Sequence, residues 1–179
     1  PVKTEGGLSS GNAGESSNFL CYRALRLNYY AVTGLLARVC LYAGQRENAF
    51  NYSTEVIKAS NNGIFPFVDR SLVNGTAQDP DRIFSPEVLF ALSDSQRGEL
   101  FEEYFDPSLA PNMVFRMETD LLEPTIYGGS GTGGNLDDYR CRSNWISSGS
   151  ARYFYKYSDM TESGRIENTM IPLLRLGEM

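Results

Sequence analysis

The sequence contains no histidine among its 179 residues. This absence excludes Ser–His and Cys–His catalytic pairs, histidine metal sites and the side chain that most often moves protons at neutral pH. The three cysteines Cys21, Cys40 and Cys141 contain no CxxC pair and are odd in number. They therefore predict neither a zinc ribbon nor a dense disulfide framework, and we interpret them as small buried hydrophobic residues. We expect no metal and no cofactor.

Long apolar runs and excess positive charge are also missing. No apolar stretch reaches the ~20 residues that a membrane-spanning helix needs, and no signal peptide is visible in the sequence. The net charge of −6 disfavours nucleic acid as a partner, because its phosphates would be repelled. Aromatic residues are plentiful, with eleven tyrosines, ten phenylalanines and one tryptophan. A neutral ligand fits this composition better than a polyanion.

Residues 28–44 predict a helix with one packed face. Beside that face, Ala31 and Gly34 leave room for another backbone to approach closely. A second helix is predicted after a turn at Gly44 and ends at residues 61–63 (NNG). Together the two helices predict a hairpin of the tetratricopeptide (TPR) kind over residues 26–62. The face expected to pack is formed by Val32, Leu35, Leu36, Val39 and Ala43.

The predicted fold is mainly α, and α+β in detail. Residues 1–18 predict a flexible lead-in, and residues 19–179 a single, incomplete domain on a TPR-like helical hairpin scaffold. An irregular, loop-rich insertion over residues 63–168 is expected to carry a few short strands. Segments 87–92 and 152–157 favour strands, and 99–105 favours a helix. Residues 171–179 are predicted as the start of the next helix, with Arg175 and Glu178 on one face.

Four segments resemble the SusD/RagB family in order and approximate spacing. They are residues 31–44 (AVTGLLARVCLYAG), Ala49 with Val56 and Ile57, residues 85–90 (SPEVLF) and residues 171–179 (IPLLRLGEM). The resemblance implies a SusD-like fold and a non-enzymatic lipoprotein that binds glycan at the outer-membrane surface. It implies a SusC-like TonB-dependent outer-membrane transporter as partner, and membrane attachment only through a lipid anchor absent from this sequence. Because family members are longer, it also implies an internal fragment.

Carbohydrate recognition needs flat aromatic faces for the apolar faces of pyranose rings. Amide, carboxylate or guanidinium groups must lie beside them to bind the hydroxyls. The irregular segments between residues 124 and 145 contain both aromatic and polar side chains, and the polar ones include Asn135, Asp137 and Arg142. From this chemistry we predict glycan contacts by Trp145, Tyr127, Tyr139, Asn144, Asp138 and Arg140.

Other functions remain open at this point. A glycosidase needs two carboxylates at a fixed separation, for which residues 102–103 (EE) and 137–138 (DD) are candidates. Adjacent acids point in different directions, so a solvated surface is the simpler interpretation. Residues 129–134 match GxGxxG but lack the strand, the helix and the later acid of a nucleotide fold, which favours a surface loop. A helical-repeat adaptor that binds a protein or peptide is the main alternative.

Overall fold

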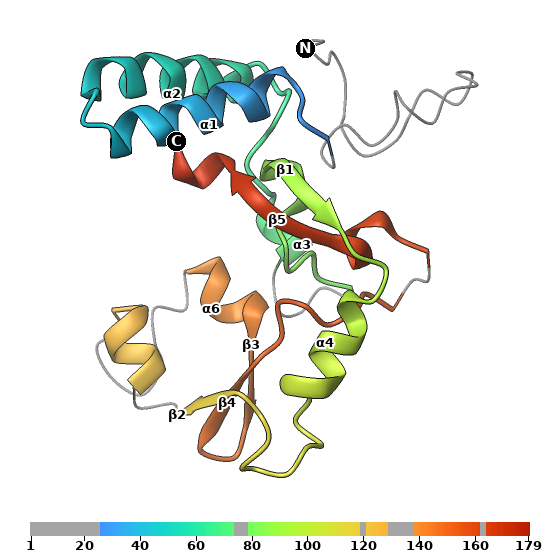
Figure 1. The fold of residues 1–179 in the computed structure, drawn as a ribbon. Coiled ribbons are helices and arrows are strands. Elements are labelled where there is room, and N and C mark those ends of the chain that lie inside the picture. Colours follow the sequence, from blue (N-terminus) through green and yellow to red (C-terminus); the bar gives the residue numbers. More distant parts are fainter. Residues whose placement is uncertain (1–25, 74–78, 119–120, 129–137, 162–163) are drawn as a thin grey trace. The chain divides into compact units, whose positions relative to one another are not determined.

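The computed structural model describes residues 26–73, 79–118, 121–128, 138–161 and 164–179 (Figure 1). Of these described residues, 46% lie in helices and 17% in strands, and they form five α-helices and two small sheets. The chain is therefore α+β, and the predicted mainly α fold with a TPR-like hairpin scaffold is wrong. One pair of helices is present. The described segments that pack against this pair form two strands, whereas a TPR-like fold would place further helices there.

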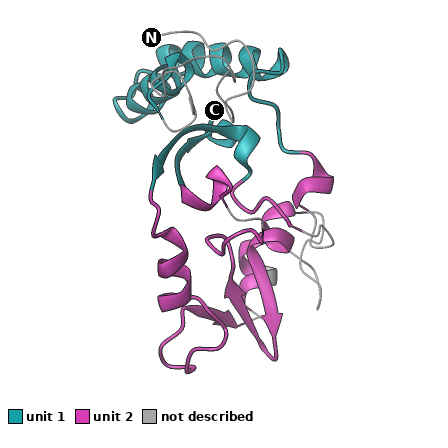
Figure 2. Cartoon of the chain, turned by 90° about the vertical axis from the view of Figure 1, so that its right-hand side faces the viewer, with its two compact units in different colours: residues 1–68, 84–93, 170–179 teal, residues 69–83, 94–169 magenta. Residues whose placement is uncertain are grey.

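The chain divides into two compact units, shown in different colours in Figure 2. Unit 1 consists of Pro1–Val68, Phe84–Ser93 and Met170–Met179, and unit 2 of Asp69–Ile83 and Asp94–Thr169. Each unit therefore combines segments that are far apart in the sequence.

Unit 1 begins with the helices α1 (Tyr29–Tyr42) and α2 (Arg46–Asn61), which lie side by side (Figure 1). Three residues connect them, and among these Gly44 adopts a φ of 74°, a conformation that glycine tolerates without strain. Helices thus occupy both positions that the apolar periodicity predicts. The hydroxyl of Tyr29 donates a hydrogen bond to the Glu55 carboxylate and links the two helices.

The second layer of unit 1 is a two-stranded antiparallel ribbon. Strand β1 (Val88–Ser93) follows the short 3-10 helix η3 (Ser85–Glu87) and pairs with β5 (Met170–Arg175), which leads into η6 (Leu176–Glu178). The prediction of a helix over residues 171–179 is wrong. The backbone N–H and C=O groups of β1 need hydrogen-bond partners, and β5 provides these partners as an extended strand. The Arg38 guanidinium of α1 binds the Glu178 carboxylate of η6.

Helix α1 buries Tyr30 and its small residues and exposes its large aliphatic ones. Leu35, Leu36 and Val39, which were predicted to pack, are 43%, 40% and 55% exposed, so that prediction is wrong. Gly34 is closely approached, but by side chains and not by the backbone that was predicted: a Cβ added there would lie 2.9 Å from Leu174 Cδ2. The side chains of the β1–β5 ribbon occupy this space, which a large residue would have closed. The buried positions of α1 are Tyr30, Ala31, Thr33, Gly34 and Ala37.

The core of unit 1 draws on both layers. In it, the rings of Tyr30 and Phe65 meet edge to face with centroids 5.1 Å apart, a favourable aromatic arrangement. Its buried members are Tyr30, Val56, Ala59, Phe65, Leu89, Leu174 and Leu176.

The side chain of Asn28 joins these two layers and is only 1% exposed. Its Nδ2 donates a hydrogen bond to the Leu89 carbonyl in β1 at 2.9 Å. Its Oδ1 accepts one from the Ala31 N–H at 2.9 Å, which caps the N-terminus of α1. One buried amide therefore satisfies a backbone donor of the helix and a backbone acceptor of the strand.

Unit 2 contains three short α-helices in its described part and a three-stranded antiparallel sheet. The helices are α3 (Arg70–Val73), α4 (Arg97–Tyr104) and α6 (Tyr139–Asn144), with the π-helical η4 (Leu122–Ile126) and the 3-10 helix η5 (Ile166–Thr169). The sheet has the order β2–β4–β3, formed by Arg116–Glu118, Ala151–Phe154 and Trp145–Ser148. Val114, Ala151 and Tyr153 pack together in its core.

Asn28→Ala should destabilise unit 1. The substitution removes a helix cap and leaves a buried carbonyl without its donor, which together cost about 2–3 kcal/mol. Urea unfolding followed by circular dichroism should show this loss as a lower midpoint. Asn51→Ala, at an exposed position of α2, is the control and should change stability by less than about 0.5 kcal/mol. Equal effects of the two substitutions would contradict the role of Asn28.

Candidate functional site

Four of the six predicted glycan-contact residues meet in unit 2. The indole Nε1 of Trp145 donates a hydrogen bond to the Tyr127 hydroxyl at 2.9 Å. The guanidinium of Arg140 lies 5.8 Å from the centroid of the Tyr127 ring, and its partner Asp138 completes the group. We call Tyr127, Asp138, Arg140 and Trp145 the aromatic–arginine cluster.

Local structure fixes the positions of these side chains. Tyr127 directly follows η4, and Asp138 is the N-cap of α6. Because α6 runs directly into β3, Trp145 stands at the junction of helix and strand. Trp145 pairs with Phe154 across β3 and β4, and the two rings contact each other with centroids 5.1 Å apart. The tryptophan ring is therefore held by a hydrogen bond and by ring packing.

The charges of Asp138 and Arg140 compensate each other. Asp138 Oδ1 accepts from Arg140 Nε at 3.0 Å, and Oδ2 accepts from Nη2 at 2.6 Å, which makes a bidentate pair. The hydrogen bond from the Arg140 side chain is the main reason why the pKa of Asp138 is lowered, and the backbone N–H of Arg140 adds to this effect. The Arg140 side chain is 59% exposed and the Asp138 side chain 18%, so the guanidinium is the more accessible partner.

The phenol of Tyr127 is neutral at physiological pH. Burial raises its pKa above the ordinary value, although the hydrogen bond from Trp145 acts in the opposite direction. In that bond the Tyr127 oxygen accepts, so its own O–H proton remains available for a second partner. The cluster thus combines aromatic surface with O–H and N–H donors.

The other two predicted contact residues, Tyr139 and Asn144, have partners outside the cluster. The ring of Tyr139 lies 5.8 Å from the Arg70 guanidinium. Asn144 is 7% exposed, accepts a hydrogen bond from Ser143 Oγ at 3.2 Å and offers its main-chain oxygen to Tyr155 N. This burial gives Asn144 a packing role within α6 and β3.

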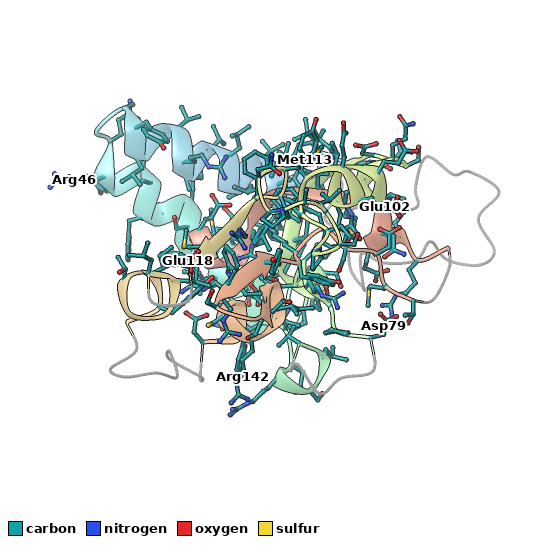
Figure 3. All side chains as sticks on the ribbon, turned by 90° about the horizontal axis from the view of Figure 1, so that it is seen from below. Arg46, Asp79, Glu102, Met113, Glu118 and Arg142 are labelled. Atoms are coloured by element: carbon teal, nitrogen blue, oxygen red, sulfur yellow. The ribbon has the colours of Figure 1, made fainter. Side chains whose placement is uncertain are left out.

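The sequence also contains polar residues that lie between the predicted glycan contacts. Asn135, Asp137 and the glycine-rich segment 129–134 lie outside the described residues. Arg142, labelled in Figure 3, projects outward from α6. It forms no part of the aromatic–arginine cluster.

Sequence reasoning missed Phe154 as the support of the Trp145 ring. Alternation over residues 152–157 separates Phe154 from Tyr153, but it does not reveal which residue faces Phe154 across the sheet. A turn signal was present at Gly149, which adopts a φ of 62° between β3 and β4. Pairing residues 145–148 with 151–154 around that glycine would have placed Trp145 opposite Phe154.

The cluster holds few groups suited to acid–base chemistry. It contains one carboxylate, and the lowered pKa of Asp138 makes this group a poor proton donor. Glycoside hydrolysis uses a second carboxylate on the other side of the scissile bond. The adjacent acids Glu102 and Glu103 are both exposed on α4, and Asp137 lies outside the described residues.

In the part of the chain that the structure describes, no group of three or more cysteine, aspartate or glutamate side chains could hold a metal ion. Cys141 is buried and Cys40 partly exposed, neither of them in a disulfide, and Cys21 lies outside the described residues. Over the same described ranges, each helix is too short or too polar to span a bilayer.

No family model, curated protein or solved structure matches this chain. Its function is therefore inferred from its own residues and their geometry.

Asp138→Asn should reduce the acid sensitivity of unfolding. A carboxyl whose folded pKa is lowered stabilises the fold above its ordinary value of 3.8, and this contribution is lost as pH falls through the folded pKa. Asparagine still caps a helix, so the substitution removes mainly the charge pair. At pH 7 the variant should be less stable by about 0.5–1 kcal/mol, and near pH 3 the difference should shrink.

Denaturant unfolding at both pH values measures this difference. Glu103→Gln, at an exposed position of α4, is the matched control and should follow the unaltered chain throughout. If Asp138→Asn lost stability by the same amount at pH 3 as at pH 7, the charge pair would not be the cause.

Proposed function

We propose that this chain binds oligosaccharide or polysaccharide at the aromatic–arginine cluster without chemical turnover. The observation that carries the proposal is the hydrogen bond from Trp145 to Tyr127, which fixes two aromatic rings beside an exposed guanidinium. Aromatic faces bind the apolar faces of pyranose rings, and guanidinium and phenol groups bind their hydroxyls.

Preorganisation supports this proposal. Trp145 is partly exposed, yet its Nε1 is hydrogen-bonded and its ring contacts Phe154. A side chain that is already held in place loses little conformational freedom when a ligand binds, so more of the contact energy appears as affinity. The ring is therefore better suited to a ligand platform than a freely rotating surface tryptophan.

Charge supports a neutral ligand. The positive charge of Arg140 is compensated by Asp138 within the cluster, and the net charge of the sequence is −6. An uncompensated guanidinium would favour a carboxylate or phosphate, whereas a paired one still offers N–H donors to hydroxyl oxygens. A neutral glycan satisfies these donors without disturbing the ion pair.

The cellular setting that we propose rests on the four segments that resemble the SusD/RagB family. On that basis the chain captures glycan at the outer-membrane surface, together with a SusC-like TonB-dependent transporter. Attachment to the membrane would be through a lipid anchor. Binding assays with that transporter test this part of the proposal separately from glycan recognition.

A second candidate function is the binding of a protein or peptide by unit 1. It is favoured by the large apolar side chains that α1 and α2 leave exposed, since such groups mark interaction surfaces when they lie together. These side chains are Leu35, Leu36, Val39, Leu41, Tyr42 and Phe50. Recovery of a defined protein partner in the absence of any glycan binding would favour this function.

Trp145→Ala should weaken glycan binding about fivefold, because loss of one aromatic contact costs on the order of 1 kcal/mol. A glycan array identifies the ligand, calorimetric titration measures its affinity, and a reducing-end assay tests for turnover. Tyr42→Ala is the control, since Tyr42 is 88% exposed on α1 and outside the cluster. Released reducing ends would instead support a glycosidase.

Tyr127→Phe separates binding from folding. This variant keeps the aromatic ring but removes the hydroxyl that accepts from Trp145, so we expect a smaller loss of affinity and a nearly unchanged melting temperature. If Trp145→Ala caused a large loss of thermal stability while glycan affinity per folded molecule stayed constant, the tryptophan would be a core residue and the proposal would fail.

A further inference from the structure

A small, partly open cavity in unit 2 is lined by three cationic side chains. It has a volume of about 10 Å³, enough for one water-sized group. No member of the aromatic–arginine cluster lines it. The lining residues are Asp81, Arg82, Ile83, Arg97, Lys156, Ser158, Met160 and Glu167.

Arg97 forms a fixed wall of this cavity. It is the first residue of α4 and only 2% exposed. Its Nη1 donates to the Glu167 carbonyl at 2.7 Å, and its Nη2 pairs with Asp159 Oδ1 at 3.1 Å. These contacts hold the guanidinium in place, because moving a buried charge away from its partners is costly.

Arg82 is the second cationic side chain and is less completely bound. Its guanidinium lies 5.5 Å from the centroid of the Tyr155 ring, and no described residue accepts a hydrogen bond from it. Burial lowers the pKa of Arg82, and the nearby charge of Arg97 lowers it further, while Tyr155 and Asp79 oppose this shift. A desolvated guanidinium next to another cation gains from an acceptor that carries negative charge.

The carboxylates around the cavity already have partners. Asp81 Oδ1 accepts from the Ile83 N–H at 3.2 Å, and Glu167 accepts from the Arg165 guanidinium at 3.3 Å. Asp79, labelled in Figure 3, is not among the lining residues and accepts from the Thr161 N–H at 3.1 Å. Three cations and two carboxylates line the cavity. Outside the lining, Asp159 pairs with Arg97 and Arg165 pairs with Glu167.

We propose that this cavity binds one small anion of about the size of chloride, held by Arg82 and Lys156 against the wall formed by Arg97. The size of the cavity favours a monatomic ion over a whole sulfate or phosphate group. An anion there accepts hydrogen bonds from Arg82 and reduces the repulsion between the two arginines. The site is independent of glycan binding, since the two sets of residues do not overlap.

Halide-dependent stability tests this proposal on the whole chain. Melting temperatures are compared in sodium gluconate, chloride, bromide and sulfate at a constant ionic strength of about 0.15 M, so that general screening is matched. Chloride and bromide should raise the melting temperature in a saturable manner by about 3 °C relative to gluconate, while sulfate should not. Equal responses to all four anions would overturn the proposal.

Arg82→Gln and Lys156→Met should each reduce the halide response. Arg46→Gln is the matched control, because Arg46 is an exposed arginine at the start of α2 in unit 1 and should leave the response unchanged. Retention of the full halide response in Arg82→Gln would overturn the proposal.

A direct measurement covers the case in which a variant fails to fold. Crystals of the unaltered chain grown in bromide should show an anomalous scattering peak within hydrogen-bonding distance of the Arg82 guanidinium. Electron density for an ordered water alone at this position, without an anomalous signal, would overturn the anion site.

Discussion

Unit 1 depends on one buried amide group. Asn28 caps the start of α1 and at the same time donates to a carbonyl of β1, so the helix and the ribbon are held at a fixed point. From that point the small face of α1 lies against the ribbon, with Gly34 next to the side chains of Leu174 and Leu89. Leu35, Leu36 and Val39 of α1 are consequently left on its outer side. The same contact that forms the core of unit 1 therefore creates its exposed apolar surface.

Local patterns in the sequence predicted where elements lie, but not which partner each element meets. The positions of α1 and α2 follow from apolar spacing and the turn at Gly44, which are local features. Residues 171–179 have apolar spacing and an early proline that also suit the start of a helix. Residues 171–175 instead belong to β5, because they pair with β1, which lies about 80 residues earlier. The choice of buried face on α1 failed for the same reason, since it depends on the ribbon.

The candidate site shows a similar division. Residue chemistry pointed to Trp145, Tyr127 and Arg140, which the structure brings together, but their contacts arise from separate segments. Phe154 supports the Trp145 ring because of the register in which β3 and β4 pair. The positions of the aromatic residues in the sequence do not reveal this register. Asn144 has suitable chemistry but is buried by the junction of α6 and β3. Side-chain type was thus readable from the sequence, whereas accessibility required the fold.

Arg140 and Arg82 of unit 2 lie in different electrostatic settings, and these settings indicate different ligands. Arg140 is exposed and paired with an adjacent carboxylate, so a ligand gains hydrogen bonds there without a change in net charge. Arg82 is desolvated, close to a second arginine and without a described hydrogen-bond acceptor, so a negative charge is favoured there. Screening by salt weakens attraction between exposed charges but hardly affects hydrogen bonds to a neutral hydroxyl. Glycan affinity at the cluster should therefore vary little with ionic strength, whereas occupancy of the cavity should follow the identity of the anion.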